Sequence, residues 1–157
     1  FGLPDNLKLS VHSGSDKFSV YPIIGKHTDG RVHLKTAGTS WLEAVKAIAI
    51  KNPSLYRTIH RKAFGYFEDA TKQYHVTTDI SAIKDLDKVS DDHLLDFFKD
   101  NNARQLIHIT YGHLLNDPEI REPFFSTLHR EEELHYSLLG DHLGNHVKGL
   151  GIGPFPV

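Results

Sequence analysis

The sequence contains 157 residues, of which 39% are hydrophobic and 24% are charged, a composition typical of a folded domain rather than of a disordered segment. Its 18 basic and 20 acidic side chains leave a formal charge of -2, which argues against nucleic acid and anionic membranes as partners. The sequence has no apolar run long enough to span a bilayer and no cysteine, so we expect a cytoplasmic protein.

The first quarter of the sequence combines strand patterns with small polar turns. Residues 7–12 alternate apolar and polar side chains, which predicts a strand, and residues 31–35 predict a second one. Residues 13–17 and 36–40 follow these strands as turns of small polar residues. The intervening residues 18–24 fit either a strand or a short helix.

The rest of the sequence predicts mainly helices. A helix follows the second turn, with Thr39 or Ser40 as its N-cap and Glu43 as the capping-box carboxylate, and it ends at Asn52-Pro53. Further helices are expected over residues 55–72, 90–101, 103–116 and 120–148, of which the last is the longest. Residues 74–78 fit a further short strand, and the glycine-rich residues 149–153 predict a flexible tail.

This order of elements predicts an α/β fold, because parallel neighbouring strands need a crossover connection such as a helix. We expect the C-terminal part of a (β/α) barrel-like arrangement of parallel strands, since strands from upstream sequence would pair the open edges. The sequence has no methionine, so Phe1 is not a translation start and the chain is interpreted as a fragment. Residues 1–53 would carry the site and residues 54–157 a mainly helical region of the same domain. A compact helical domain on a small sheet is the alternative.

Both polar turns lie where catalytic groups gather in parallel α/β folds, at the carboxyl ends of the strands. The sequence contains 12 histidines, and imidazole both ligates metals and transfers protons. His12 ends the first strand and is the first candidate for a metal ligand, although it could equally make ordinary loop hydrogen bonds. Asp16 could complete a metal site, act as an acid–base group, or only cap the segment that follows.

The other candidates in these turns are amines and hydroxyls. Lys17 and Lys35 could hold a substrate carboxylate, or they could be solvated surface amines. Ser13 and Thr36 supply hydroxyls, and the helix that begins after Thr36 would add its N-terminus to a cradle for an anion. His142 and His146 share a helix face, but a metalloprotease motif would have a Glu after the first histidine, so a solvated or subunit-facing stripe is the preferred interpretation.

Two motifs, Val11-His-Ser-Gly-Ser-Asp-Lys-Phe18 and His33-Leu-Lys-Thr-Ala-Gly-Thr-Ser-Trp41, resemble the tagaturonate epimerase family, also described as tagaturonate/fructuronate epimerases. The resemblance extends to Leu134-His-Tyr136 and His142-Leu-Gly-Asn-His146. It implies a longer protein, built on a (β/α) barrel, that acts as a metal-dependent isomerase on a small anionic sugar in hexuronate catabolism. It also implies a divalent cation held by His12, with Asp16, Lys17, Lys35 and Thr36 as pocket residues.

The implied reaction inverts a carbon beta to a ketone, whose C–H bond the carbonyl does not acidify, so simple enolisation cannot achieve it. Retro-aldol cleavage, followed by recombination on the other face of the aldehyde, would invert this carbon, with Asp16 or an upstream group moving the proton. Transient oxidation by a nicotinamide is the competing route, and this chain carries no dinucleotide loop. The fragment alone should be inactive. The alternative function is a non-catalytic helical module that forms a homo-oligomer through its terminal helix.

Overall fold

The computed structural model describes residues 7–12, 16–72 and 76–153. The chain forms two compact units, one made of the segments Phe1–Ser40 and Leu139–Val157 and the other of Trp41–Leu138. The sequence boundary expected at residue 53 therefore falls inside the second unit. We describe each unit by itself.

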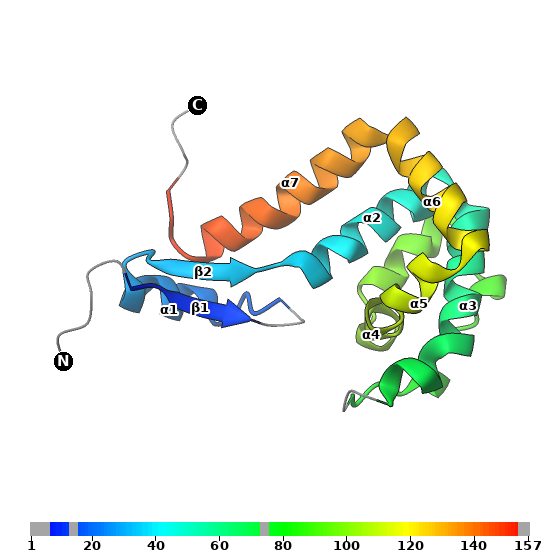
Figure 1. Ribbon diagram of the computed structural model, residues 1–157, viewed down its shortest axis with the longest axis horizontal. Helices are drawn as coiled ribbons and strands as arrows, with labels where there is room; N and C mark the ends of the chain where they lie inside the picture. Colours follow the sequence, from blue (N-terminus) through cyan, green and yellow to red (C-terminus); the bar gives the residue numbers. More distant parts are fainter. Residues whose placement is uncertain (1–6, 13–15, 73–75, 154–157) are drawn as a thin grey trace. The chain divides into compact units, whose positions relative to one another are not determined.

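The first unit contains a pair of parallel strands, β1 (Leu9–His12) and β2 (Val32–Lys35). Leu9 is the register partner of Val32, and His12 is that of Lys35. Figure 1 shows the two arrows side by side and pointing the same way. The predicted strands and their parallel pairing are thus confirmed, and the chain between them forms a helix, α1 (Tyr21–Thr28), which contacts β2.

Helix α1 begins and ends where its sequence dictates. Pro22 lies in its first turn, where the missing N–H costs no helical hydrogen bond. It ends at Asp29, whose φ of 51° is left-handed, followed by Gly30 at a φ of 71°. Aspartate and glycine are among the residues that adopt this conformation most readily, so the pair turns the chain sharply into β2.

The first unit also holds the last turns of α7 (Glu132–Gly149) and the residues that follow it. Leu150 is buried, and its backbone N–H donates to the carbonyl of His146. The carbonyl of Leu150 lies so close to Gly25 of α1 that a Cβ there would be 2.0 Å from its oxygen. The flexible tail expected at residues 149–153 is therefore wrong, because this segment closes the helix and packs against α1; residues 154–157 lie outside the described residues.

The second unit is built of helices. In chain order the elements after β2 are α2 (Ala37–Lys51), α3 (Pro53–Thr71), the 3₁₀ helices η1 (Ile80–Ala82), η2 (Leu86–Lys88) and η3 (Asp91–Phe98), then α4 (Asn101–Ile109), α5 (Tyr111–Asn116), α6 (Pro118–Arg130) and α7. Asn52 separates α2 from α3 as expected and caps α3 by accepting from the Leu55 N–H at 3.2 Å. Asp117 caps α6 in the same way, ahead of Pro118.

Several predicted boundaries were wrong. The helix expected over residues 103–116 is interrupted at Thr110, and the one over 120–148 at Glu131, so that α3 with 19 residues is longer than α7 with 18. Residues 91–98 form a 3₁₀ helix instead of an α-helix. Thr39 and Ser40 lie inside α2 and do not cap it, and Glu43 pairs with Lys46 at 2.6 Å. Of the strand expected at 74–78, residues 76–78 are described and are not a strand.

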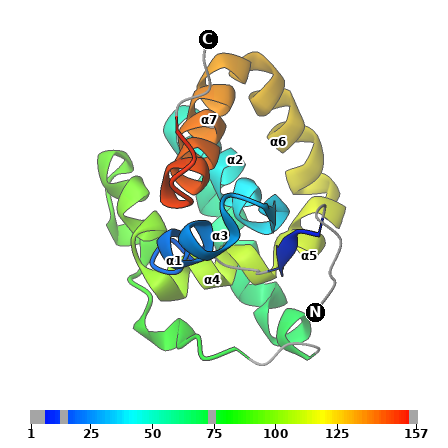
Figure 2. The ribbon, with the colours of Figure 1, turned by 90° about the vertical axis from the view of Figure 1, so that its left-hand side faces the viewer.

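The core of the second unit is apolar, and α3 packs in it against α4, α5 and α6 (Figures 1 and 2). Trp41 lies at its edge, with its ring 4.9 Å from that of Phe124 and its indole N–H donating to the carbonyl of Ile107 at 3.0 Å. The most deeply buried of the larger aliphatic side chains are Val45, Ile48, Ile59, Leu94, Leu106, Leu114 and Ile120. The described residues thus combine a helix-rich fold with a two-stranded parallel sheet. None of the helices within them is both long and apolar enough for a membrane crossing.

Candidate functional site

The two polar turns start next to each other, because His12 and Lys35 are register partners at the carboxyl ends of the parallel strands. Alternate residues of a strand point to the same face. Ser10 and His12 on β1 therefore share one face with His33 and Lys35 on β2, and all four are exposed. The structure gives the strand pair one polar face that carries two of the predicted site residues.

A single hydroxyl links the two imidazoles on this face. Ser10 Oγ lies 2.7 Å from His12 Nε2 and 3.0 Å from His33 Nδ1. A hydroxyl has one proton, so it donates to one ring and accepts from the N–H of the other. The His12 ring is thereby oriented. The structure does not group His12 with the three described side chains that could share a metal ion, so its role as a ligand stays a prediction.

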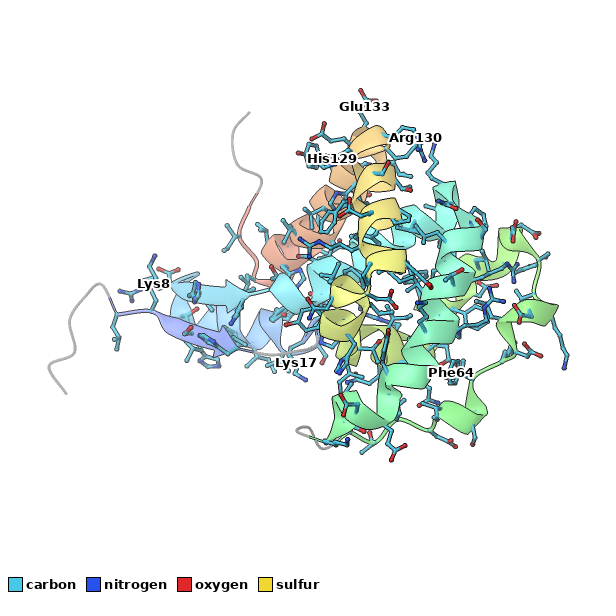
Figure 3. The ribbon with its side chains drawn as sticks, turned by 45° about the vertical axis from the view of Figure 1, so that its right-hand side comes forward. Lys8, Lys17, Phe64, His129, Arg130 and Glu133 are labelled. Carbon is cyan, nitrogen blue, oxygen red and sulfur yellow. The ribbon has the colours of Figure 1, made fainter. Side chains whose placement is uncertain are left out.

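The remaining predicted residues lie in or beside the turns. Lys17 is exposed and follows β1 (Figure 3), while its backbone N–H donates to the Tyr21 hydroxyl at 3.2 Å. Thr36 is half-buried, and its carbonyl accepts the hydroxyls of Thr39 and Ser40, each at 3.1 Å. These two hydroxyls thus fold back onto the start of α2. Ser13 lies outside the described residues.

A second polar group is buried in the first unit. Asp16 Oδ1 lies 3.0 Å from His146 Nε2 and 3.8 Å from His142 Nε2, and the three side chains are 9%, 4% and 8% exposed. One ligand atom from each residue lies within 4.8 Å of the other two. The structure thus brings one predicted site residue, Asp16, together with two helical histidines near the other end of the chain.

Neighbouring elements enclose this group. The ring of Phe18 lies 4.8 Å from that of His146, and the ring of Tyr21 lies 5.4 Å from it. On the other histidine, Nε2 of His142 is 3.0 Å from the hydroxyl of Thr39. The group is therefore packed against two aromatic rings, Phe18 before α1 and Tyr21 within it, and against the first turn of α2.

The protonation of His146 follows from its hydrogen bonds. Its Nδ1 lies 2.8 Å from the backbone carbonyl of His142, and a carbonyl can only accept, so Nδ1 carries a proton. Nε2 of a neutral ring is then a bare lone pair, yet it faces a carboxylate oxygen at 3.0 Å. A positive charge between these two atoms, either a proton or a metal ion, is required to make the contact favourable.

The sequence reasoning was wrong about these histidines. The stripe expected to face solvent or another subunit is buried at both His142 and His146. The spacing of four residues was the available signal, but it was set aside because a metalloprotease motif also needs a glutamate. Asp16 supplies the carboxylate instead, 130 residues from His146, where no local pattern reveals it.

The second unit has a charged cluster that is internally satisfied. Asp117 accepts from Lys62 at 2.6 Å, from the Tyr66 hydroxyl at 2.7 Å and from the Glu119 N–H at 3.0 Å. The hydrogen bonds from Lys62 and then Tyr66 hold the pKa of Asp117 below its usual range. These partners engage both oxygens of its carboxylate, so the cluster stabilises the start of α6.

Comparisons with known proteins match most of the chain. A family model described as tagaturonate epimerase (UxaE) matches residues 5–150. A tagaturonate/fructuronate epimerase from Thermotoga maritima is 48% identical over 143 residues, which are 91% of this chain and 30% of that protein. The native crystal structure of fructuronate-tagaturonate epimerase UxaE from Cohnella laeviribosi is 50% identical with a TM-score of 0.87, and the match covers 92% of this chain and 31% of the other. A structure of the Cohnella enzyme with two glycerols has a TM-score of 0.87 at 48% identity, over 93% of this chain and 31% of the other. The chain thus spans about 30% of the length of these relatives.

Proposed function

The chain belongs to the tagaturonate epimerase family, and from this premise we propose that the whole protein containing it is an isomerase that interconverts tagaturonate and fructuronate in hexuronate catabolism. The relatives described above are epimerases, which leaves the alternative of a non-catalytic oligomerisation module without support. We further propose that β1 and β2 are two strands of a (β/α) barrel in the whole protein and that the reaction is cytoplasmic. Formation of a homo-oligomer stays a prediction.

The observation that carries the proposal, beyond the family, is the shared polar face at the strand ends. It places an imidazole, His12, and an amine, Lys35, side by side on neighbouring strands. An imidazole at a strand end suits a transition-metal cation, and a nearby amine suits the carboxylate of a sugar acid. One face would thus offer a partner to each half of a ketouronate. A cation at His12 would bind the ketone and its hydroxyls, and the amine of Lys35 would bind the carboxylate.

We favour a retro-aldol route, which breaks and re-forms a carbon–carbon bond, because the inverted carbon lies beta to the ketone and simple enolisation cannot invert it. In the retro-aldol direction the hydroxyl on that carbon loses its proton, and this carbon and its oxygen become the carbonyl group of an aldehyde. The electrons of the broken bond pass to the carbon next to the ketone and give an enediolate. The aldehyde then turns, the bond forms again on its other face, and the proton returns to the new hydroxyl.

His12 fits a metal-ligand role in this scheme, since it is exposed at the strand end and its ring is oriented by Ser10. One imidazole does not complete a site, so we propose that further ligands come from other strands of the whole protein. When bound, a divalent cation supplies Lewis-acid polarisation of the ketone and its neighbouring hydroxyl.

The other residues at the strand ends would bind and orient the substrate. Lys35 and Thr36 would bind the carboxylate, with Ser13 as a further hydroxyl, and Lys17 would carry a proton to and from the reacting hydroxyl. Of the roles that the sequence left open for Asp16, acid–base exchange needs access to the sugar. Its side chain is 9% exposed and faces His146, which favours the ligand role.

The test uses the full-length protein, because this chain spans 30% of the curated relative. Supplied with a divalent metal, it should convert either ketouronate into a mixture of both, measured by chromatography. His12→Ala should lower turnover about 100-fold or more and reduce the bound metal, since a ligand is removed. His27→Ala, an exposed imidazole on α1, is the matched control and should change neither. Normal turnover and metal content in the His12 variant would refute its assignment.

A further inference from the structure

We propose that Asp16, His142 and His146 form a buried binding site for a divalent transition-metal ion such as Zn²⁺, separate from the cation assigned to His12. The three side chains offer one carboxylate oxygen and two imidazole nitrogens within 4.8 Å of one another. This inference stands on the geometry of the first unit and does not depend on the reaction that the whole protein performs.

The first argument is the orientation of the His146 ring. The Nδ1 proton of His146 is donated to a backbone carbonyl at 2.8 Å, which turns the Nε2 lone pair toward Asp16. Histidines that bind metals usually donate their other ring N–H to a carbonyl or a carboxylate, as His146 does here. A cation bound at Nε2 would occupy this lone pair and lie against the Asp16 carboxylate oxygen.

The second argument is distance. Ligand atoms about 2.0–2.1 Å from a tetrahedral metal lie roughly 3.3–3.5 Å from one another. The separations of Asp16 Oδ1 from the two Nε2 atoms, 3.0 and 3.8 Å, bracket this value. Two imidazoles thus converge on one carboxylate oxygen at the spacing of a coordination shell.

The third argument concerns a fourth donor. The Thr39 hydroxyl lies 3.0 Å from His142 Nε2 and 3.1 Å from the carbonyl of Thr36. If its proton goes to that carbonyl, its lone pairs face the site, and the set becomes two nitrogens and two oxygens. Such a mixed set favours Zn²⁺, Co²⁺ or Ni²⁺ over Mg²⁺ and Ca²⁺, which prefer shells of oxygen alone.

The enclosure points to a structural ion. Rings of Phe18 and Tyr21 pack against His146, and structural metal sites are closed whereas catalytic ones keep an open position. The ion would tie Asp16 to a helix 130 residues away in sequence. It would therefore hold the end of the turn after β1, where Lys17 lies, against the last turns of α7.

The test measures metal binding by the full-length protein, with each metal used alone as the probe. After removal of metals by a chelator, titration with Zn²⁺ or Co²⁺ should show this site in addition to the one at His12. His146→Ala should weaken binding here about 100-fold or more and leave the His12 site occupied. His129→Ala, an exposed residue in the last turn of α6 (Figure 3), is the control and should bind as the native protein does.

A second variant keeps the test decisive if His146→Ala does not fold. Asp16→Asn preserves the size of the side chain but removes its charge, so it should lose the same equivalent of metal. Zn²⁺ should raise the melting temperature of the native protein and of His12→Ala, but not that of Asp16→Asn. Unchanged metal binding in Asp16→Asn would overturn the proposal, as would ¹⁵N NMR showing both ring nitrogens of His146 protonated in excess Zn²⁺. If Asp16→Asn lost bound metal while His12→Ala bound as much metal as the native protein, the proposal would stand and only the assignment of His12 as a metal ligand would be refuted.

Discussion

Both compact units bury imidazoles, yet their surroundings differ. In the first unit the ring of His146 is engaged at both nitrogens, by a backbone carbonyl at 2.8 Å and by Asp16 at 3.0 Å. In the second unit His60 is 1% exposed, and among the described residues its Nε2 has no hydrogen-bond partner. Phe64 and Phe97 surround it, with ring centroids at 5.2 and 5.3 Å. The same side chain thus makes polar contacts through both ring nitrogens in one unit and packs as a neutral aromatic ring in the other.

The side chains around a buried histidine, rather than the residue type itself, therefore decide its charge and its contacts. Burial lowers the pKa of His60 to about 4, with only a partly opposing effect from Asp87, so the ring is neutral at physiological pH. The second unit should therefore depend on apolar packing, whereas the first should depend on oriented polar contacts and on close backbone approach. Three comparisons between variants test this contrast.

The largest effect is expected from the apolar core of the second unit. Phe124 is 2% exposed, and its ring lies 4.9 Å from that of Trp41. Phe124→Ala should lower the free energy of unfolding by about 4 kcal/mol, because the lost burial is compounded by a cavity. Urea denaturation followed by fluorescence measures this directly, since Trp41 is the single tryptophan of the sequence and contacts the altered position.

The neighbouring residue provides a matched control. Phe125 is 39% exposed, so Phe125→Ala removes a ring of equal size from the surface and should cost less than about 1 kcal/mol. Equal losses for the two variants would contradict the idea that this unit depends on its buried apolar core.

The next effect is a dependence on pH. The pKa of His60 is about 4 in the folded protein and about 6.5 in the unfolded chain, so the unfolded state binds more protons between these values. Stability should be at its full value above pH 6.5 and fall by about 3 kcal/mol as the pH drops through 4. Denaturation measured across this range should show the loss in the native protein.

His60→Leu is the variant that isolates this contribution. Leucine fills a similar volume with no ionisable group, so the His60 share of the pH dependence should disappear while stability at pH 7 changes little. An unchanged slope between pH 6.5 and 4 would show that other groups cause the acid lability, and the contrast between the two buried imidazoles would lose its energetic basis.

Local patterns predicted much of this fold. Alternation over residues 7–12 and 31–35 predicted both strands, and the order of strand, turn and helix predicted their parallel pairing. Proline marked the helix boundaries at Pro53 and Pro118. The interruptions at Thr110 and Glu131 were missed because neither position carries the proline or glycine that usually marks a break.

The candidate site divides in the same way. His12 and Lys35 could be placed side by side because strand register is a local property of two short segments. The buried group could not be predicted, because Asp16 meets His146 only through the packing of α7, and a separation of 130 residues leaves no local pattern that reveals the contact. The burial of His60 was also hidden, since a histidine within a helical pattern says nothing about its partners.

The smallest expected effects come from two helical glycines, one in each unit. At Gly25 a Cβ would lie 2.0 Å from the Leu150 carbonyl oxygen and 2.7 Å from its carbon, both backbone atoms, so α1 and the end of α7 would have to separate. At Gly65 in α3, no atom lies within 4 Å of the added Cβ. Gly25→Ala should therefore cost about 2 kcal/mol, as overpacking does, whereas Gly65→Ala should stabilise by up to about 1 kcal/mol, because alanine favours a helix. Hydrogen exchange at the backbone amides of α1 and α3 would assign each change in stability to its unit. A loss of stability in both variants would mean that neither helix tolerates an added methyl group.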